Sequence, residues 1–318
     1  MGNPPRRNRD DDDRPTSFWK GLARDALVAG LIVAVFLGAL YLYAGVWPPL
    51  VVVESSSMQH GKQASSLGVI DTGDMVFQQS ASTRGSVVTY IEGRASGYST
   101  YGDYGDVIIF RRAGTPTPII HRAIMYITLH ANGTADVPDM SLLPTSEWVA
   151  QNGGGPTQVP MYLKELTVRS MGYQHNIDLT FKFGMFPLAE RTGYVTKGDN
   201  NLDYDPLSSI PRLQDVQGRA RGEIPWLGLV KLTLQPTDTC CMSWGDTEAP
   251  KNSWDSLLIT LIFLIALPFI LEYAARGWTK FVSPHLPQIR WPWRKSRGPQ
   301  ADPEEPGDAG DWDDQDLP

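Results

Sequence analysis

The distribution of apolar and charged positions divides the chain into two long apolar runs and a polar segment between them. The first run, residues 26–47, has 22 positions without a charge, and a membrane-spanning helix needs about 20. The second run, residues 256–271, has 16 such positions and reaches spanning length when Trp254 and Tyr273 are included. The pattern therefore predicts transmembrane helices at residues 26–47 and 254–273.

Each run has an alternative interpretation. The first resembles a cleaved signal peptide, but the apolar region of a signal peptide has only about 7–15 residues and ends in small side chains. This run is longer and ends with the aromatic residues Tyr41, Tyr43 and Trp47. The second run would be a buried core helix kinked at Pro268, but Leu, Ile and Phe surround the whole helix, which favours lipid.

Basic residues lie on the outer flanks of both runs. Lys and Arg accumulate on the cytoplasmic side of a membrane, whereas acids have little weight. We therefore expect a cell-membrane protein with a cytoplasmic N-terminal tail (residues 1–25) and a cytoplasmic acidic tail (residues 274–318), and with residues 48–253 outside. Segments 1–20 and 296–318, rich in Pro and charge, are expected to be disordered. The basic residues are Arg6, Arg7, Arg9, Arg14, Lys20 and Arg24 before the first run, and Arg276, Lys280, Arg290, Arg294, Lys295 and Arg297 after the second.

Residues 48–253 consist mainly of short β-branched and aromatic runs separated by Gly, Pro, Asn and Asp, a pattern typical of strands and turns. We therefore expect a mainly β domain between the two membrane helices, with a short helix near residues 141–151. The pattern is looser at about residues 131–190, which predicts an inserted subdomain or long loops between two parts of the β domain, residues 48–130 and 191–253. The predicted strands are at residues 51–53, 75–77, 87–91, 107–110, 119–120, 123–129, 179–183, 193–196 and 227–232.

Composition excludes several classes of protein. The 318 residues carry a formal charge of −7, but eight of the 35 acids lie in the segment 301–318, and the charges of the remainder nearly balance, so no nucleic-acid binding is expected. The two cysteines, Cys240 and Cys241, are neighbours, which excludes a disulfide-rich scaffold and a cysteine-based zinc finger. The sequence has no HExxH, P-loop or G-x-S-x-G motif, and neither a metal nor another cofactor is expected.

The candidate chemistry is a serine nucleophile. Residues 55–57 are three serines that follow the predicted strand at residues 51–53, and a serine becomes a nucleophile only beside a base. His121, at the end of another apolar run, is a candidate base, and the acids that would orient it cluster at residues 199–205. Each feature alone is more typical of a turn or of a structural residue. The argument for catalysis therefore rests on the features as a set.

Short motifs follow the first apolar run in a definite order. They are Ser55-Ser56-Ser57-Met58, Thr72-Gly73-Asp74, Gly105-Asp106-Val107-Ile108-Ile109-Phe110, Ile120-His121-Arg122, Thr196-Lys197-Gly198-Asp199-Asn200-Asn201 and Ile224-Pro225-Trp226-Leu227-Gly228. This set resembles the type I signal peptidases of the archaeal and endoplasmic-reticulum kind over about residues 26–126 and 193–232. The resemblance implies a membrane-bound serine endopeptidase that cleaves signal peptides from secreted precursors after small residues, through an acyl-enzyme.

The resemblance also implies roles for particular residues. Ser57, the serine before the methionine of the first motif, is the nucleophile, and its backbone N–H and Ser55 are expected to stabilise the oxyanion. His121 stands where the bacterial branch has Lys, which indicates a Ser–His enzyme. Asp205 is favoured as the partner of the histidine, with Asp199 as a close support, whereas Asp203 is disfavoured.

A substrate is expected to dock as an extended strand beside residues 51–55 and 69–76, because strand addition supplies backbone hydrogen bonds and pockets for alternate side chains. Shallow apolar pockets would select small residues before the cut. The expected partners are secretory precursors with signal peptides and membrane lipid, with the translocation machinery as a further candidate. The expected substrate-binding residues are Val52, Val53, Met58, Ile70 and Met75.

Two features depart from the pattern of the family. His60 stands where the family usually has Pro, and is expected to be a groove residue rather than a second base. A separation of 78 positions between His121 and Asp199 exceeds what this branch usually needs. Both features keep open a second hypothesis, a non-catalytic membrane scaffold with a peptidase-like peptide-binding groove. A sortase-like enzyme is disfavoured because the cysteine pair has no suitable neighbouring histidine.

Overall fold

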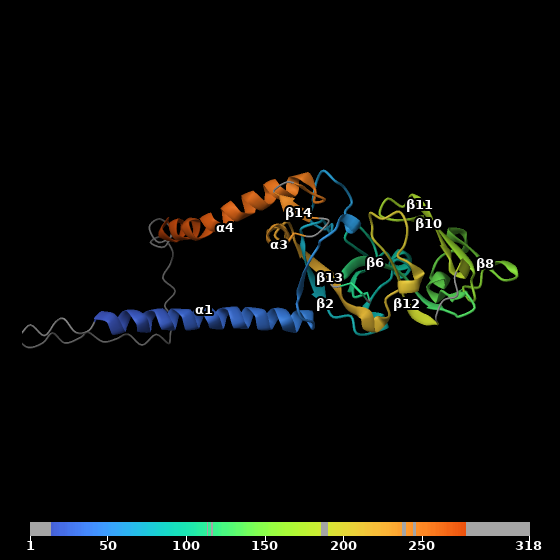
Figure 1. The fold of residues 1–318 in the computed structure, drawn as a ribbon, viewed down its shortest axis with the longest axis horizontal. Coiled ribbons are helices and arrows are strands. Elements are labelled where there is room, and N and C mark those ends of the chain that lie inside the picture. Colours follow the sequence, from blue (N-terminus) through green and yellow to red (C-terminus); the bar gives the residue numbers. More distant parts are fainter. Residues whose placement is uncertain are drawn as a thin grey trace, which may run out of the picture. The chain divides into compact units, whose positions relative to one another are not determined.

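The computed structural model describes residues 14–277, apart from residues 113, 116, 186–189, 237–239 and 244–245. Most of each predicted tail, residues 1–13 and 278–318, lies outside the described residues. The described part is mainly β, with antiparallel sheets and one long apolar helix towards each end of the chain (Figure 1). All the sheets belong to one compact unit, residues 1–262, and a second unit begins at Phe263, within the last helix.

Both predicted membrane segments lie in helices that are long and apolar enough to cross a membrane. Helix α1 is Arg14–Ala44, of which Trp19–Ala44 is the apolar part, and helix α4 is Lys251–Gly277. Pro268 lies inside α4 without ending it. Since α1 begins at Arg14, the prediction that residues 14–20 are disordered was wrong. The helix extends toward the N-terminus through residues 14–20, whose Pro and charged residues had favoured a prediction of disorder.

The main sheet has seven strands among the described residues. Its order is β1-β2-β13-β5-β6-β12, and β7 pairs with β6 beyond this path. All its pairs are antiparallel. The two predicted strands at residues 119–120 and 123–129 are one long strand, β6. The strands are β1 (Leu50–Val52), β2 (Met75–Gln79), β5 (Val107–Phe110), β6 (Ile119–Leu129), β7 (Ala135–Asp136), β12 (Arg191–Lys197) and β13 (Val216–Ile224).

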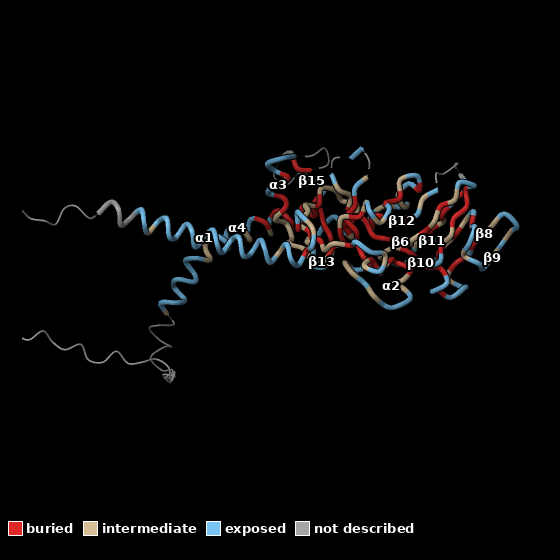
Figure 2. Tube along the Cα trace, turned by 90° about the horizontal axis from the view of Figure 1, so that it is seen from below, coloured by how far each residue is buried: buried red, intermediate tan, exposed pale blue. Residues whose placement is uncertain are grey.

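The predicted insertion, residues 131–190, contains a second sheet of four antiparallel strands in the order β11-β10-β8-β9. Its buried side chains join those of β6 in one hydrophobic cluster, in which Trp148 and Phe181 of the insertion pack with Ile127 and Leu129. The buried segments in Figure 2 accordingly run through both sheets. The strands are β8 (Trp148–Asn152), β9 (Gly155–Thr157), β10 (Glu165–Met171) and β11 (Ile177–Lys182), and two small hairpins are formed by β3 (Ser99–Thr100) with β4 (Asp103–Tyr104) and by β14 (Cys240–Ser243) with β15 (Asp246–Thr247).

The prediction of a strand at residues 87–91 was wrong, because this run leads into helix α2 (Tyr90–Ser96). Thr89 caps the helix by accepting a hydrogen bond from the Glu92 N–H, and the Glu92 carboxylate accepts one from the Thr89 N–H. Gly97 ends the helix in the left-handed conformation with φ 80°. A threonine followed three residues later by a glutamate is the sequence signal of this capping box.

Two further predictions of local structure were wrong. The predicted strand at residues 227–232 is helix α3 (Gly228–Leu234), in which Leu229 and Leu232, three residues apart, are buried on one face. The predicted helix near residues 141–151 consists of two single 3-10 turns, Pro138–Leu142 and Thr145–Glu147, followed by strand β8. Pro144 separates the two turns and prevents a longer helix.

The end of helix α1 is attached directly to the main sheet. The Ser80 N–H donates to the Ala44 carbonyl at 2.7 Å, and the Gln78 N–H donates to the Pro49 carbonyl at 2.9 Å. The Gln78 side chain donates to the Pro48 carbonyl at 2.6 Å. Strand β1 therefore starts within a few residues of the membrane helix, at the edge of the sheet.

Replacing the cap of α2 should destabilise the protein. Thr89→Ala removes the acceptor of the Glu92 N–H and also the hydroxyl that donates to the buried Asp139 at 3.0 Å. We expect the free energy of unfolding to fall by about 1–2 kcal/mol. The measurement is denaturant unfolding of the full chain in detergent, followed by circular dichroism. Ser96→Ala, at the exposed end of the same helix, is the control and should change stability by less than about 0.5 kcal/mol; equal effects of the two substitutions would contradict the role of the cap.

Candidate active site

Three of the predicted site residues are connected to one another by hydrogen bonds. His121 Nε2 is 3.1 Å from Ser57 Oγ, and His121 Nδ1 is 2.6 Å from Asp205 Oδ2. The side chains of His121 and Asp205 are about one-tenth exposed, at 9% and 11%. A nucleophile, a base and a carboxylate that orients the base are thus within hydrogen-bond reach of one another, which is the arrangement of a serine hydrolase.

The nucleophile lies on a 3-10 turn, Ser56–Met58, that follows strand β1. Met58 is buried and anchors the turn in the core. Asn200 donates two hydrogen bonds to the turn, from its N–H to the Ser57 carbonyl at 2.9 Å and from its side chain to the Ser56 carbonyl at 3.0 Å. Gly198 completes the contact, because a Cβ there would be 2.6 Å from the Ser57 carbonyl oxygen. The position of Ser57 therefore depends on the turn at residues 198–201.

The base and its partner come from adjacent strands. His121 is on β6, where it pairs in register with Ile108, and Asp205 follows β12. The Thr196 hydroxyl donates to Asp205 Oδ2 at 2.5 Å, and the Thr196 carbonyl accepts from the Asp205 N–H at 2.8 Å. Arg112 Nη2 lies 3.6 Å from Asp205 Oδ1. Burial raises the pKa of Asp205, but the hydrogen bond and charge of His121, the Thr196 bond and Arg112 outweigh it, so the pKa lies below its usual value. Asp205 is therefore a carboxylate at neutral pH.

Asp199 has different partners. Arg122 donates to both of its oxygens, from Nε at 2.8 Å and from Nη2 at 2.6 Å, and His60 Nε2 is 3.0 Å from Oδ2. Burial raises the pKa of Asp199, but the guanidinium and the His60 hydrogen bond outweigh it and lower the pKa to about 2. The structure thus gives the two predicted aspartates different partners: Asp205 contacts His121, and Asp199 belongs to a buried ion pair with Arg122. Asp203, the disfavoured acid, is exposed.

His60 lies between the catalytic domain and the insertion. Besides its bond to Asp199, its ring stacks on that of Tyr173 at 4.1 Å between centroids, with 10° between planes. The side chain is 16% exposed. These contacts with Asp199 and Tyr173 make His60 part of the support of the turn that carries Ser57, three residues earlier in the chain.

A cleft of about 370 Å³ opens beside Ser57, His121 and Asp205. Val52 and Val53, which were predicted to contact substrate, line this cleft together with Ser55, whose Oγ is 3.3 Å from Ser57 Oγ. Met58 and Ile70, also predicted to contact substrate, are instead 1% exposed and belong to a core cluster with Val53 and Ile120. Met75 is on β2 and pairs with Val52. Glu54, in the segment beside which substrate was expected to dock, also lines the cleft. The lining residues that sequence reasoning had not assigned to it include Arg112, Thr117, Pro118, Ile119, Ile120 and Asn201.

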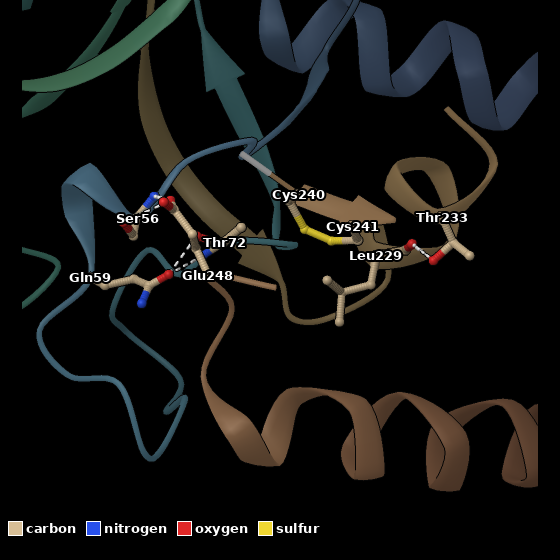
Figure 3. The surroundings of a disulfide bond; sticks show 8 residues. All are labelled: Ser56, Gln59, Thr72, Leu229, Thr233, Cys240, Cys241 and Glu248. Atoms are coloured by element: carbon tan, nitrogen blue, oxygen red, sulfur yellow. Dashed lines mark hydrogen bonds between the residues drawn. A yellow bond between two sulfur atoms is a disulfide. The ribbon is translucent and has the colours of Figure 1, made fainter. Parts of the chain in front are cut away.

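Ser56, next to Ser57, contacts a residue that is distant in the sequence, Glu248. Glu248 accepts hydrogen bonds from Ser56, at 2.9 Å from the hydroxyl and 3.3 Å from the N–H (Figure 3). Glu248 follows the β14–β15 hairpin, in which Cys240 and Cys241 are joined by a disulfide. The pair is buried among Leu229, Trp254 and other apolar side chains. The sequence offered no signal for the Glu248 contact, because 192 positions separate the two residues.

The different partners of the two aspartates predict different effects of their substitution. Asp205→Asn should lower peptide cleavage by about 10³–10⁴-fold, because the imidazole loses its orienting carboxylate, with little change in melting temperature. Asp199→Asn should instead destabilise the fold by about 3–5 kcal/mol at pH 6, because it leaves the buried Arg122 without its counter-charge.

The pH dependence gives a further readout of the same pair. A carboxyl whose pKa falls from about 3.8 unfolded to about 2 folded contributes stability above pH 4 and loses it as the pH falls to 2. The stability difference between wild type and Asp199→Asn should therefore narrow by about 2 kcal/mol between pH 4 and pH 2 in melting experiments. A difference that is constant over this range would contradict the depressed pKa.

No protein-family model matches the chain, and no curated protein is significantly similar to it. The function therefore has to be inferred from the chain's own residues and from their placement. The hydrogen bonds that connect Ser57, His121 and Asp205 beside the cleft are the feature on which that inference rests.

Proposed function

We propose that the protein is a membrane-anchored serine endopeptidase that removes signal peptides from secretory precursors. The observation that carries the proposal is the line from Ser57 Oγ through the His121 ring to the Asp205 carboxylate, with separations of 3.1 and 2.6 Å. The same spacing disfavours a non-catalytic scaffold, because a groove that only binds peptide does not require a base within reach of a serine.

The geometry supports an acyl-transfer mechanism. Ser57 Oγ attacks the carbonyl carbon of the scissile peptide bond while His121 Nε2 accepts the hydroxyl proton, and Asp205 stabilises the resulting imidazolium. The imidazolium then gives this proton to the departing amine as the C–N bond breaks, which leaves an acyl ester on Ser57. Water, deprotonated by His121, hydrolyses the ester. The Ser57 N–H and the Ser55 hydroxyl are the proposed donors to the oxyanion, and one such donor contributes about 2.7–4 kcal/mol in a comparable site.

The cleft suits an extended peptide with small side chains. Strand β1 is an edge of the main sheet, so its outer backbone groups are positioned to pair with an added strand. Val52 and Val53 on one wall and Ile119 and Ile120 on the other make the cleft apolar beside the nucleophile. A volume of about 370 Å³ is at the small end of the usual range for binding pockets, which favours short side chains before the cut.

The membrane helices supply the second argument. Ser57 is ten residues beyond Trp47, so at 3.3–3.6 Å per residue it lies at most about 35 Å from the end of the first span. A signal peptide inserted in the same membrane presents its cleavage site within that range. We infer that both termini face the cytoplasm and that residues 48–253 lie outside, because the basic residues flank the two spans on their outer sides.

Substitution of the three consecutive serines tests the mechanism. Ser57→Ala should reduce cleavage of a secretory precursor by at least about 10³-fold, and Ser55→Ala by about 10²–10³-fold. Ser56→Ala is the matched control and should retain cleavage, because the Ser56 hydroxyl bonds to Glu248 rather than to the triad. The assay is trimming of a radiolabelled precursor by membranes that contain each variant. Equal trimming by Ser57→Ala and wild type would refute the proposal.

The orientation predicts which positions are accessible from outside the cell. A membrane-impermeant maleimide should label Gly154→Cys, on the exposed β8–β9 hairpin, in intact cells. It should label Asn8→Cys, in the N-terminal tail, only after the membrane is permeabilised. The unsubstituted chain is the control for Cys240 and Cys241, which are paired. Labelling of Asn8→Cys in intact cells would contradict a cytoplasmic N-terminus.

A further inference from the structure

The insertion reaches back to the catalytic domain through the turn between β10 and β11. The turn is fastened at two points: Tyr173 stacks on His60 and its hydroxyl donates to the His60 carbonyl at 3.4 Å, while His175 Nε2 is 3.2 Å from Asp103 Oδ1. The His175 ring also stacks on that of Tyr104 at 5.1 Å. The turn is thus held in a defined place beside the active site.

A cavity of about 230 Å³ lies between this turn and the turn that carries the acid motif; we call it the turn cavity, lined by residues 172–174, 176–177 and 199–202. Asn201 lines both the turn cavity and the catalytic cleft. Asn200, the neighbouring lining residue, is bonded to the carbonyls of Ser56 and Ser57. The two hollows therefore share a wall, and that wall is attached to the nucleophile turn.

The lining of the turn cavity combines the apolar side chains of Ile177 and Leu202 with several side-chain amides, and its one ionised group is the Asp199 carboxylate, whose charge is neutralised by Arg122. The Gln174 side chain donates to the Tyr173 hydroxyl at 3.0 Å, and the Asn176 side chain donates to the side-chain amide oxygen Oε1 of Gln174 at 3.1 Å. Side-chain amides both donate and accept, so they match the backbone groups of an extended peptide. The cavity thus offers hydrogen bonds without a fixed preference of charge.

We propose that the turn cavity binds the first residues of the mature protein, on the C-terminal side of the scissile bond. This inference rests on the proposed function, in which the apolar cleft holds the signal-peptide side and the chain continues past Ser57. A chain that leaves the cleft beside Asn201 enters the turn cavity. The insertion is then a specificity element that reads the mature end, and neutral polar residues are the side chains that its amides accommodate.

A charge exchange at Gln174 tests the inference. Gln174 is exposed and its substitution does not disturb the core. In the full chain in detergent, Gln174→Lys should raise kcat/KM for peptides with Glu relative to Lys at the second and third positions after the bond, and Gln174→Glu should do the reverse. The expected change in this ratio is about 1.5- to 5-fold in each direction, as for a solvent-exposed charge pair. Gln158→Lys and Gln158→Glu, beyond β9 at the opposite edge of the insertion sheet, should leave the ratio unchanged.

A methyl ester with the same acyl part separates failure of the inference from failure of the proposed function. Its leaving group is methanol, which is too short to reach the turn cavity, so its Ser57-dependent hydrolysis reports the triad alone. Opposite shifts at Gln174, absent at Gln158, support the inference. An unchanged ratio at Gln174, or equal shifts at Gln158, in an enzyme that hydrolyses the ester would overturn the inference and leave the proposed function standing. Absence of Ser57-dependent turnover of both ester and peptides would overturn both.

Discussion

The buried ion pair between Arg122 and Asp199 organises the region around the candidate active site. The two side chains are 1% and 4% exposed, and the guanidinium also donates to the carbonyls of Thr100, Asp103, Tyr104 and Gly105 at 3.0–3.2 Å. All its strong donors are thus satisfied by oxygen atoms, which is the condition under which a buried charge is tolerated. One arginine thereby joins the loop at residues 100–105 to the turn at residues 198–201.

The position of Arg122 in β6 explains how the ion pair supports the candidate site from the opposite face of the strand. His121 and Arg122 are consecutive in a strand, so their side chains point to opposite faces of the sheet. His121 faces the cleft, whereas Arg122 is directed into the loops behind it. Asp199 of the pair also contacts His60, and the ring of His60 stacks on Tyr173 of the insertion. A long insertion can therefore contact the site through the support of the nucleophile turn while the triad keeps its geometry.

The sequence predicted those parts of the fold that depend on local composition. The two apolar helices and the Val- and Ile-rich strands β1, β5 and β6 follow directly from side-chain pattern. Strand β13 was missed because it contains glycine and arginine in the middle of the sheet, where Arg219 and Arg221 lie 3.6 and 3.3 Å from the buried Asp106. Polar side chains that are neutralised by a residue more than 100 positions away give no local strand signal.

The members of the candidate site could be predicted, and the resemblance also favoured Asp205 over Asp199 as the partner of His121. Ser57, His121 and Asp205 could be named from ordered motifs, and their hydrogen bonds lie where the motifs implied. That assignment came from the resemblance alone, because both aspartates lie in one turn-rich stretch and local pattern does not show that Arg122 and His60 are the partners of Asp199. The residues that build the second wall of the cleft, and Glu248 beside Ser56, are likewise fixed only by tertiary contacts.

The difference between the two aspartates has a chemical consequence. Both are ionised at neutral pH, since the pKa of each lies below its usual value. The charge of Asp199, however, is matched by the Arg122 guanidinium, which cannot lose its proton. The attraction between Asp199 and Arg122 is therefore the same before and during a reaction. Asp205 faces the His121 imidazole, with Arg112 at the longer distance of 3.6 Å. In the mechanism we propose, that imidazole receives the Ser57 proton, so the attraction of Asp205 for His121 is strongest in the transition state, and an interaction that strengthens there accelerates the chemical step.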